Sequence, residues 1–440
     1  MKGIFWLGIL GITSLQIFST NPCLAQSSNI ITDDSLGNEA SQIERNSKFK
    51  GLPVEVIRGG AQRGINLFHS FREFNVSKGR GAYFFSPNAE IQNILTRVTG
   101  NNRSEILGTL GTFGNSQPNL FLINPNGILF GENASLDVQG SFVGTTANGL
   151  QFGERGVFSA TNPEAPGLLT VNPSAFFFNQ INAQASIQNN SVLRVPNGKS
   201  LVLLGGDVSM DGGGLNAYGG RIELGGLTEP GTVALDINGN NFRLGFPENV
   251  ERGDVSLTNG VGIYVTADAD GDIVVNARNL EMRERSSLSA GIGHGLSSDN
   301  SKGGNIHVNA TGIVKLSNSD ILNNLLFKAR GQGGDVNIIA NTLLVQDGAR
   351  INADTFGEGK GGNVTIYTDK FLVKDGARVS VDTFGEGKGG DLTVNAQDTQ
   401  LFGTSKNGEF ASGLTATTYR SRGDGGNLTL STNKLLVQDG

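Results

Sequence analysis

Cysteine and tryptophan occur only once each in this chain of 440 residues, as Cys23 and Trp6. Residues 1–25 have the layout of a secretory signal peptide, with Met1-Lys2, an apolar run from Gly3 to Phe18 and a short segment up to Ala25. This layout predicts cleavage after Ala25. The mature chain would then contain no thiol. This excludes disulfides, zinc–thiolate sites and a nucleophilic cysteine, so stability must come from packing and backbone hydrogen bonds.

Charged residues are also scarce, at 17% of the chain, and the formal net charge is −6. Lys2 is the only charge within residues 1–25, so the mature chain carries −7, which is −6 less one positive charge. No dense cluster of lysine and arginine offsets this acidic balance. Nucleic acid is therefore not expected as a partner.

Helical periodicity is missing as well, because after residue 25 no stretch repeats its apolar residues every 3.6 positions over more than two turns. With 65 glycines and only 37% hydrophobic residues, the composition favours short strands and many turns. Alternating segments such as Val255-Ser256-Leu257 recur along the chain. The predicted fold class is all-β.

The sequence contains no recognisable catalytic or metal-binding motif. The three histidines are scattered, and His69 lies in a strand-like apolar segment, which favours a structural histidine. Asp268 to Asp272 begins like a calcium loop, but Ile273 and Asn279 stand where an EF-hand needs Gly and Glu. A polar corner is the better interpretation, and we expect neither a cofactor nor a metal site.

One stretch combines two strand signals with a tight turn. Leu120 to Ile123 and Ile128 to Phe130 are apolar β-prone runs, and Asn124-Pro125-Asn126-Gly127 separates them. Pro125 presets φ, Asn126 either tolerates left-handed geometry or caps with its amide, and Gly127 takes a positive φ without steric cost. This stretch should therefore turn the chain between two strands.

Large aromatic residues concentrate between residues 51 and 180. They are Phe68, Phe71, Phe74, Phe84, Phe85, Phe113, Phe121, Phe130, Phe142, Phe152, Phe158 and Phe176 to Phe178. In a solenoid such rings fill the interior or cover an open end, which otherwise exposes apolar core and unpaired strand edges. We expect this region to start and cap the solenoid, with the rings in its core.

From about residue 200 a sequence pattern repeats. Each copy has one or two glycines, then Asp or Asn, then an apolar residue, any residue and a second apolar residue. The Asp or Asn of each copy is Asp207, Asp254, Asp272, Asn305, Asp335, Asn363, Asp391 or Asn427. The last five intervals are 33, 30, 28, 28 and 36 residues. Such a period is typical of solenoids, whose units bury their apolar faces against their neighbours.

Within one unit, residues 364–366, 371–373 and 379–381 should form three strands, which predicts a triangular, right-handed parallel β-helix with an N-terminal capping β region. Alternation should direct Val364, Ile366, Val379 and Val381 inward, and Thr365, Arg378 and Ser380 toward water. On the corners, Glu358, Lys360, Glu386 and Lys388 should stack as opposite charges one coil apart.

The turn and its surroundings resemble the secretion domain of the filamentous haemagglutinin family, the exported partner in bacterial two-partner secretion. The resemblance is carried by residues 65–71, 103–110, 117–131 and 134–147, while residues 205–208 and 219–225 look like the variant common in cyanobacterial members. In the family, the motifs Asn-Pro-Asn-Leu and Asn-Pro-Asn-Gly-Ile matter for secretion. In this chain Gln117 replaces the first asparagine of the Asn-Pro-Asn-Leu motif. The matching positions are Pro118, Asn119, Leu120, Asn124, Pro125, Asn126, Gly127 and Ile128.

The predicted domains are the signal peptide (residues 1–25), a two-partner secretion domain with its cap, which the resemblance implies (26–290), and β-helix repeats of about 28–36 residues (291–440). The repeats stop at Gly440 in mid-repeat, which indicates either a fragment or an open last coil. The implied partner is a cognate outer-membrane β-barrel transporter, and the implied location, reached through the periplasm, is the medium or the cell surface.

The implied function is that of a non-enzymatic adhesin that meets an unknown cell-surface or glycan receptor. Two alternatives stay open. A polysaccharide-active, lyase-like β-helix enzyme would need acidic residues gathered on one outer face, and a contact-dependent toxin would carry a distinct globular C-terminal domain. The dispersed charges and the uninterrupted repeats favour the adhesin.

Overall fold

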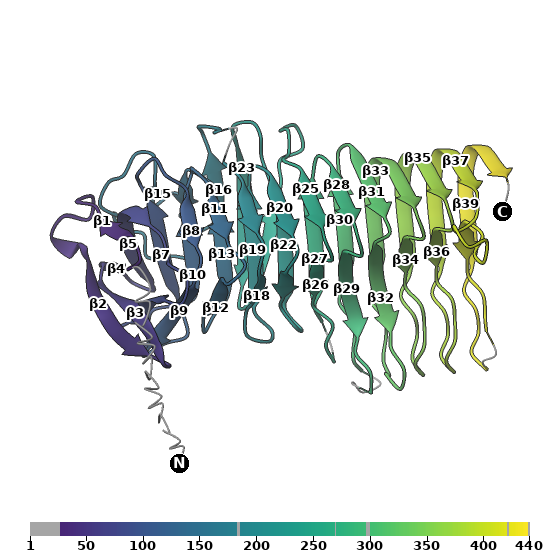
Figure 1. Cartoon of the computed structure of the whole chain (residues 1–440), viewed down its shortest axis with the longest axis horizontal. Helices are drawn as coiled ribbons and strands as arrows, with labels where there is room; N and C mark the ends of the chain where they lie inside the picture. Colours follow the sequence, from purple (N-terminus) through teal and green to yellow (C-terminus); the bar gives the residue numbers. More distant parts are fainter. Residues whose placement is uncertain (1–26, 183–184, 269, 296–299, 420–421, 439–440) are drawn as a thin grey trace, which may run out of the picture.

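A computed structural model describes residues 27–182, 185–268, 270–295, 300–419 and 422–438. The predicted signal peptide lies outside these residues. Successive coils of chain stack along one axis, with β1–β5 at one end and β39 at the other (Figure 1). The described residues include a single helical turn, η1 (Gly37–Glu39). Within these ranges no helix has the length and hydropathy needed to cross a membrane. The predicted all-β parallel helix is thus confirmed.

Three columns of parallel strands form the faces of the β-helix. The first face stacks β5 (Asn66–Phe74), β7 (Asn93–Val98), β10 (Asn119–Ile123), β13 (Phe142–Thr145), β19 (Ser200–Gly205), β22 (Arg221–Gly226), β27 (Asp272–Ala277) and β30 (Ile306–Ala310). The second face stacks β8 (Ser104–Ile106), β11 (Ile128–Phe130), β17 (Ile187–Asn189), β20 (Val208–Asp211), β25 (Val255–Thr258), β28 (Leu280–Arg283) and β31 (Ile313–Ser317).

In the later coils single long strands run around the corner between these two faces. They are β33 (Val336–Gln346), β35 (Val364–Lys374), β37 (Leu392–Phe402) and β39 (Leu428–Gln438).

The third face consists of two parallel stacks. The first is β3 (Leu52–Gly59), β6 (Gly81–Ser86), β9 (Thr109–Gly114) and β12 (Ser135–Asp137). The second is β18 (Val192–Arg194), β21 (Gly214–Asn216), β26 (Gly262–Tyr264), β29 (Ser287–Ile292), β32 (Asp320–Leu325), β34 (Arg350–Asn352), β36 (Arg378–Ser380) and β38 (Gly413–Thr415).

The interior of the triangle is filled by the residues that alternation directs inward. Val364, Ile366, Val379 and Val381 are fully buried, as predicted. The prediction for Ser380 is wrong, because only 4% of this residue is exposed. Its Oγ donates a 2.7 Å hydrogen bond to Asp354 Oδ1 on the preceding coil. Ser380 belongs to the outward set, but it lies at the bottom of a groove over β34 and β36, which shelters it from water.

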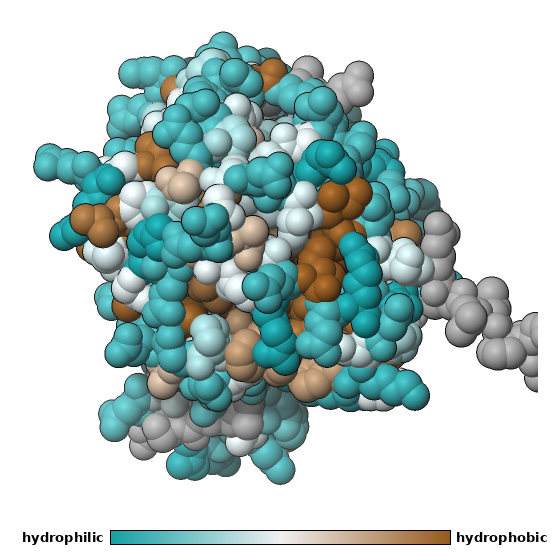
Figure 2. All heavy atoms as spheres, turned by 90° about the vertical axis from the view of Figure 1, so that its left-hand side faces the viewer, coloured by the Kyte–Doolittle hydropathy of each residue, from teal (hydrophilic) through white to brown (hydrophobic). Residues whose placement is uncertain are grey.

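Antiparallel strands close the N-terminal end of the β-helix. β1 (Ile30–Thr32) and β4 (Ala61–Arg63) pair with β5, and β2 (Ser41–Phe49) pairs with β3. Ile30 and Phe74 are buried in the same core cluster as the later coils. Viewed at this end, the surface is mostly hydrophilic, with a smaller apolar area (Figure 2). The cap thus covers the apolar interior that an open first coil would expose.

A second, external sheet covers the outer side of the first face. It contains β14 (Gly149–Gln151), β15 (Val157–Ser159), β16 (Ala175–Phe178), β23 (Gly231–Asn238) and β24 (Asn241–Gly245), all antiparallel. Phe121 and Ile123 of β10 point into this second core, where they meet rings such as Phe158 and Phe176. The apolar run 120–123 is continuous because both of its sides are buried. The aromatic residues therefore divide between two cores, which the sequence did not reveal.

At the charged corner of the repeats, equivalent residues of successive coils lie above one another. Lys360 and Lys388 form a parallel bridge on successive coils, and Glu358 instead pairs with Arg330 at 2.8 Å. The expected opposite-charge rungs are therefore wrong. The 28-residue period places each side chain directly above its own counterpart, so alternating charges within one unit cannot meet across coils.

Candidate functional site

The turn at residues 124–127 forms the corner between β10 on the first face and β11 on the second. The Gly127 N–H donates to the Asn124 carbonyl oxygen at 3.1 Å, and Gly127 has φ of +111°. The Asn126 N–H donates to Asn124 Oδ1 at 2.9 Å. Asn126 has no positive φ, so the structure does not use its tolerance of left-handed geometry; the cap comes from the Asn124 side chain, to which Asn126 Nδ2 also donates at 3.3 Å. The turn is thus closed by both a backbone and a side-chain hydrogen bond.

Two amides tie this turn to the preceding coil. Asn124 is fully buried, and its Nδ2 donates to the Asn102 carbonyl oxygen and to Ser104 Oγ, both at 3.0 Å. Asn126 Nδ2 donates to the Gly100 carbonyl oxygen at 2.7 Å. A buried amide that loses such partners leaves acceptors unsatisfied, which costs about 1–3 kcal/mol per group. Asn124 and Asn126 therefore fix the register of two coils.

The remaining motif residues serve the same corner and strand. Leu120 and Ile128 are buried in the interior core, and the Ile128 N–H donates to the Ser186 carbonyl oxygen at 3.1 Å. Pro118 is buried before β10, and a side chain on Gly140 would come within 2.6 Å of its carbonyl oxygen. Only Pro125, Asn126 and Asn119 keep partial exposure among the eight motif residues.

Asn119 belongs to a ladder of asparagines at the start of the first face. Asn119 Nδ2 donates to Asn93 Oδ1 at 3.0 Å, and Asn93 Nδ2 donates to Asn66 Oδ1 at 2.9 Å. Asn66 Nδ2 then donates to the carbonyl oxygens of Leu169 and Val171 at 2.7 Å. Asn66 and Asn93 were not among the predicted site residues, although the spacings of 27 and 26 residues along this ladder match one coil.

His69 is completely buried beneath this region, as a structural histidine should be. Its Nδ1 lies 2.9 Å from Ser41 Oγ, and Nε2 has no hydrogen-bond partner among the described residues. Burial lowers the pKa of His69 to about 3. The folded protein therefore holds the neutral imidazole far below the pH at which an unfolded histidine takes up a proton.

We expect His69 to make the fold acid-sensitive. Between about pH 6.5 and 3 the unfolded chain binds a proton that the folded chain refuses, so the free energy of unfolding falls as pH falls, by up to about 1.4 kcal/mol per unit. His69→Gln should remove this part of the slope. Urea unfolding followed by circular dichroism at pH 4 to 8 measures the free energy of unfolding as a function of pH. The control is His294→Gln, which changes an exposed histidine. An unchanged slope in His69→Gln would contradict the assignment.

The repeat residues also form ladders, but on two corners rather than one. At the first-face corner, each Oδ1 accepts the backbone N–H of its counterpart on the next coil at 2.8–2.9 Å, in the order Asp272, Asn305, Asp335, Asn363, Asp391 and Asn427. Asp207 instead accepts the Asp254 N–H at 2.8 Å at the start of the second face. The glycine–aspartate pattern thus marks both corners, and sequence alone merged them.

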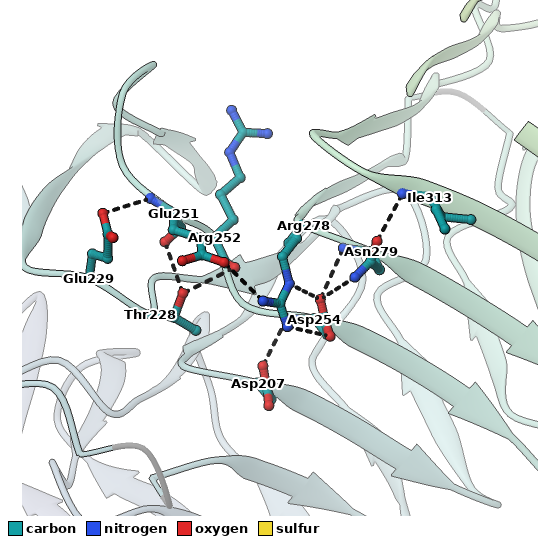
Figure 3. Close-up of polar contacts among 9 residues, drawn as sticks. All are labelled: Asp207, Thr228, Glu229, Glu251, Arg252, Asp254, Arg278, Asn279 and Ile313. Carbon is teal, nitrogen blue, oxygen red and sulfur yellow. Dashed lines mark hydrogen bonds and ion pairs between the residues drawn. The ribbon is translucent and has the colours of Figure 1, made fainter. Parts of the chain in front are cut away.

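Asp254 is the centre of a polar network on this second corner (Figure 3). Arg278 donates from Nε and Nη2 to the two Asp254 oxygens at 2.9 and 2.8 Å, and from Nη1 to Glu251 at 2.9 Å. Asn279 donates to Asp254 and accepts the Ile313 N–H at 2.9 Å. The hydrogen bonds from Arg278 lower the pKa of Asp254. A carboxylate that accepts this many hydrogen bonds holds neighbouring coils together and is not suited to transfer protons.

These features define a class of protein, a capped parallel β-helix with a second antiparallel sheet on one face and corners built from stacked amides. A family model described as the TPS secretion domain matches residues 28–276, more than half of the chain. The chain therefore belongs to the family of two-partner secretion domains. Members of this family are secreted exoproteins, and the domain implies in general a cognate outer-membrane transporter.

One solved structure agrees with this assignment in fold. The HMW1 secretion domain from Haemophilus influenzae is 18% identical with a TM-score of 0.56, and the alignment covers 91% of this chain and 99% of that one. The filamentous hemagglutinin secretion domain aligns over the same shares with 14% identity and a TM-score of 0.38. A comparison with curated proteins found no match.

Proposed function

We propose that this chain is an adhesin-type exoprotein that is exported by its own outer-membrane transporter and presents its β-helix outside the cell. The observation that supports this most is the match of residues 28–276 to the TPS secretion domain. The thiol-free, locally connected architecture suits folding after export. A solenoid can nucleate at its cap and add coils one after another, because each coil contacts mainly its neighbours.

In this proposal the turn at residues 124–127 acts by setting the scaffold. Its two amides are directed at the preceding coil, and the turn residue Asn124 is fully buried. An unfolded chain that emerges from a transporter must form this corner before the next coil can stack on it. The motif would therefore govern how readily the first coils fold.

Asn126→Ile tests this role. The isoleucine side chain cannot donate to the Gly100 carbonyl oxygen or to Asn124 Oδ1, so we expect export to fall by about tenfold or more, in line with a loss of about 1–3 kcal/mol. Asn101→Ile, an exposed residue on the neighbouring loop, is the matched control and should be exported normally. Export is measured in the medium of a diderm bacterium that expresses the chain with and without the partner transporter.

Each outcome of this experiment has a clear meaning. Release that depends on the transporter supports the proposal, whereas secretion without it, or retention in the periplasm, contradicts two-partner export. Normal export of Asn126→Ile would remove the turn from the mechanism while leaving the transporter dependence intact.

A further inference from the structure

A groove of about 710 Å³ runs across the third face of the later coils, over β32, β34 and β36. The strands are in register, so outward residues form columns along the axis. One column contains Asn324, Asp354 and Asp382, and another contains Asn352 and Ser380. All of these point out of the β-helix, yet Asp354, Asp382, Asn352 and Ser380 are at most 9% exposed. They form a floor of sheltered polar groups.

Aromatic rings border this floor. Phe356 and Phe384 stack with centroids 4.8 Å apart and planes within 5°, and Tyr419 continues the stack at 5.1 Å. On the opposite side Phe410 lies under the Arg378 guanidinium, 4.9 Å from its ring centroid. Phe384 and Phe410 are 41% and 48% exposed, which is unusual for phenylalanine. The groove therefore has a polar floor between two apolar rims.

The charges that line the groove balance. Three arginines, Arg285, Arg350 and Arg378, face three aspartates, Asp320, Asp354 and Asp382. Arg350 and Asp320 already form a bidentate pair at 3.0 and 2.7 Å. A strongly charged ligand would gain from one set and be repelled by the other. The lining suits a neutral ligand that both donates and accepts hydrogen bonds.

One floor residue lacks a partner. Asn352 is only 9% exposed, and its Oδ1 is buried but accepts no hydrogen bond from any described residue. A buried carbonyl oxygen of this kind is rare in native proteins and calls for a donor. A hydroxyl group that enters the groove above β34 would supply it.

We propose that this groove binds a segment of a neutral polysaccharide along the axis of the β-helix. A polyhydroxylated chain offers a donor and an acceptor at each sugar, and its apolar ring faces suit aromatic rims. An extended peptide fits less well, because the strands beneath already pair on both sides and leave no edge for β-augmentation. The inference rests on the proposed adhesin function and names its receptor class.

The test uses the purified full-length chain and affinity electrophoresis in gels that contain galactomannan, xyloglucan or hydroxyethyl cellulose, with polygalacturonate as an anionic comparison. We expect retardation by at least one neutral polymer. Asn352→Ala removes the floor amide and Phe384→Ala removes an exposed rim ring, and each should weaken binding by about tenfold. Asn395→Ala, an outward residue of β37 on another face, is the matched control and should bind normally.

Phe384→Ala keeps the test informative if Asn352→Ala fails to fold, because Phe384 is largely outside the packed core. Retardation by none of the neutral polymers, preference for polygalacturonate, or equal binding by Phe384→Ala would each overturn the inference. Binding is measured on purified protein, whereas export is measured in living cells. A groove that binds no polysaccharide would therefore not contradict two-partner secretion, and a failure of export would not change the binding result.

Discussion

Replacing Arg97 by methionine is expected to lower the free energy of unfolding by about 3 kcal/mol or more and to abolish export. Arg97 is fully buried on β7, and burial lowers its pKa only to about 10, so it stays charged at neutral pH. Its guanidinium donates to Ser70 Oγ, Ser35 Oγ and the carbonyl oxygens of Ser159 and Glu164 at 2.8–2.9 Å. It therefore ties the first face, the cap and the external sheet together.

Methionine fills much of the same space but removes all four of these hydrogen bonds from a buried site. Arg97→Lys keeps the charge but has only one nitrogen, so we expect an intermediate loss. The exposed Arg155→Met, which removes the same group at the surface of the external sheet, should change stability by less than about 0.5 kcal/mol. Because Trp6 precedes the predicted cleavage site, urea unfolding is followed by circular dichroism. Equal midpoints for Arg97→Met and the natural chain would refute this role.

Gly362→Ala is expected to separate the later coils. A Cβ at this position would lie 1.7 Å from the Gly334 carbonyl oxygen on the preceding coil, a distance that no backbone adjustment within the stack can absorb. Gly390 meets Gly362 in the same way at 1.8 Å. The coils would have to move apart, which would break the 2.8 Å hydrogen bond from the Asn363 N–H to Asp335. We expect a loss of about 3 kcal/mol or more.

Hydrogen exchange measured by mass spectrometry locates this effect. Protection should fall in β33, β35 and β37, while β7, β10 and β13 should stay protected, because stability in a solenoid is the sum of local interfaces. Gly413→Ala is the control, since its added Cβ would meet nothing within 4 Å. Uniform loss of protection along the whole chain, or none at all, would contradict a local effect.

Much of the candidate site could be predicted from short sequence stretches because it is local. The turn at residues 124–127 needs a side-chain cap and a positive φ within four residues, and Asn124 and Gly127 provide them. The inward alternation of Val364 and Ile366 likewise follows from strand geometry alone. The partners of these turns on other coils were not predictable, because they lie about one coil away in sequence.

The sequence by itself determined that this chain is an all-β solenoid with turns at its glycine–aspartate and asparagine–glycine corners, and that its single cysteine lies in the predicted signal peptide. These properties depend on composition, on period-two alternation and on residues that favour one backbone conformation. Only the tertiary structure decided that Asp207 and Asp272 occupy different corners, that Ser380 is sheltered, and that a second sheet buries the outer side of β10. The physical reason is that stacking and coverage depend on segments that are 20 to more than 100 residues apart, such as Asn66 and Leu169.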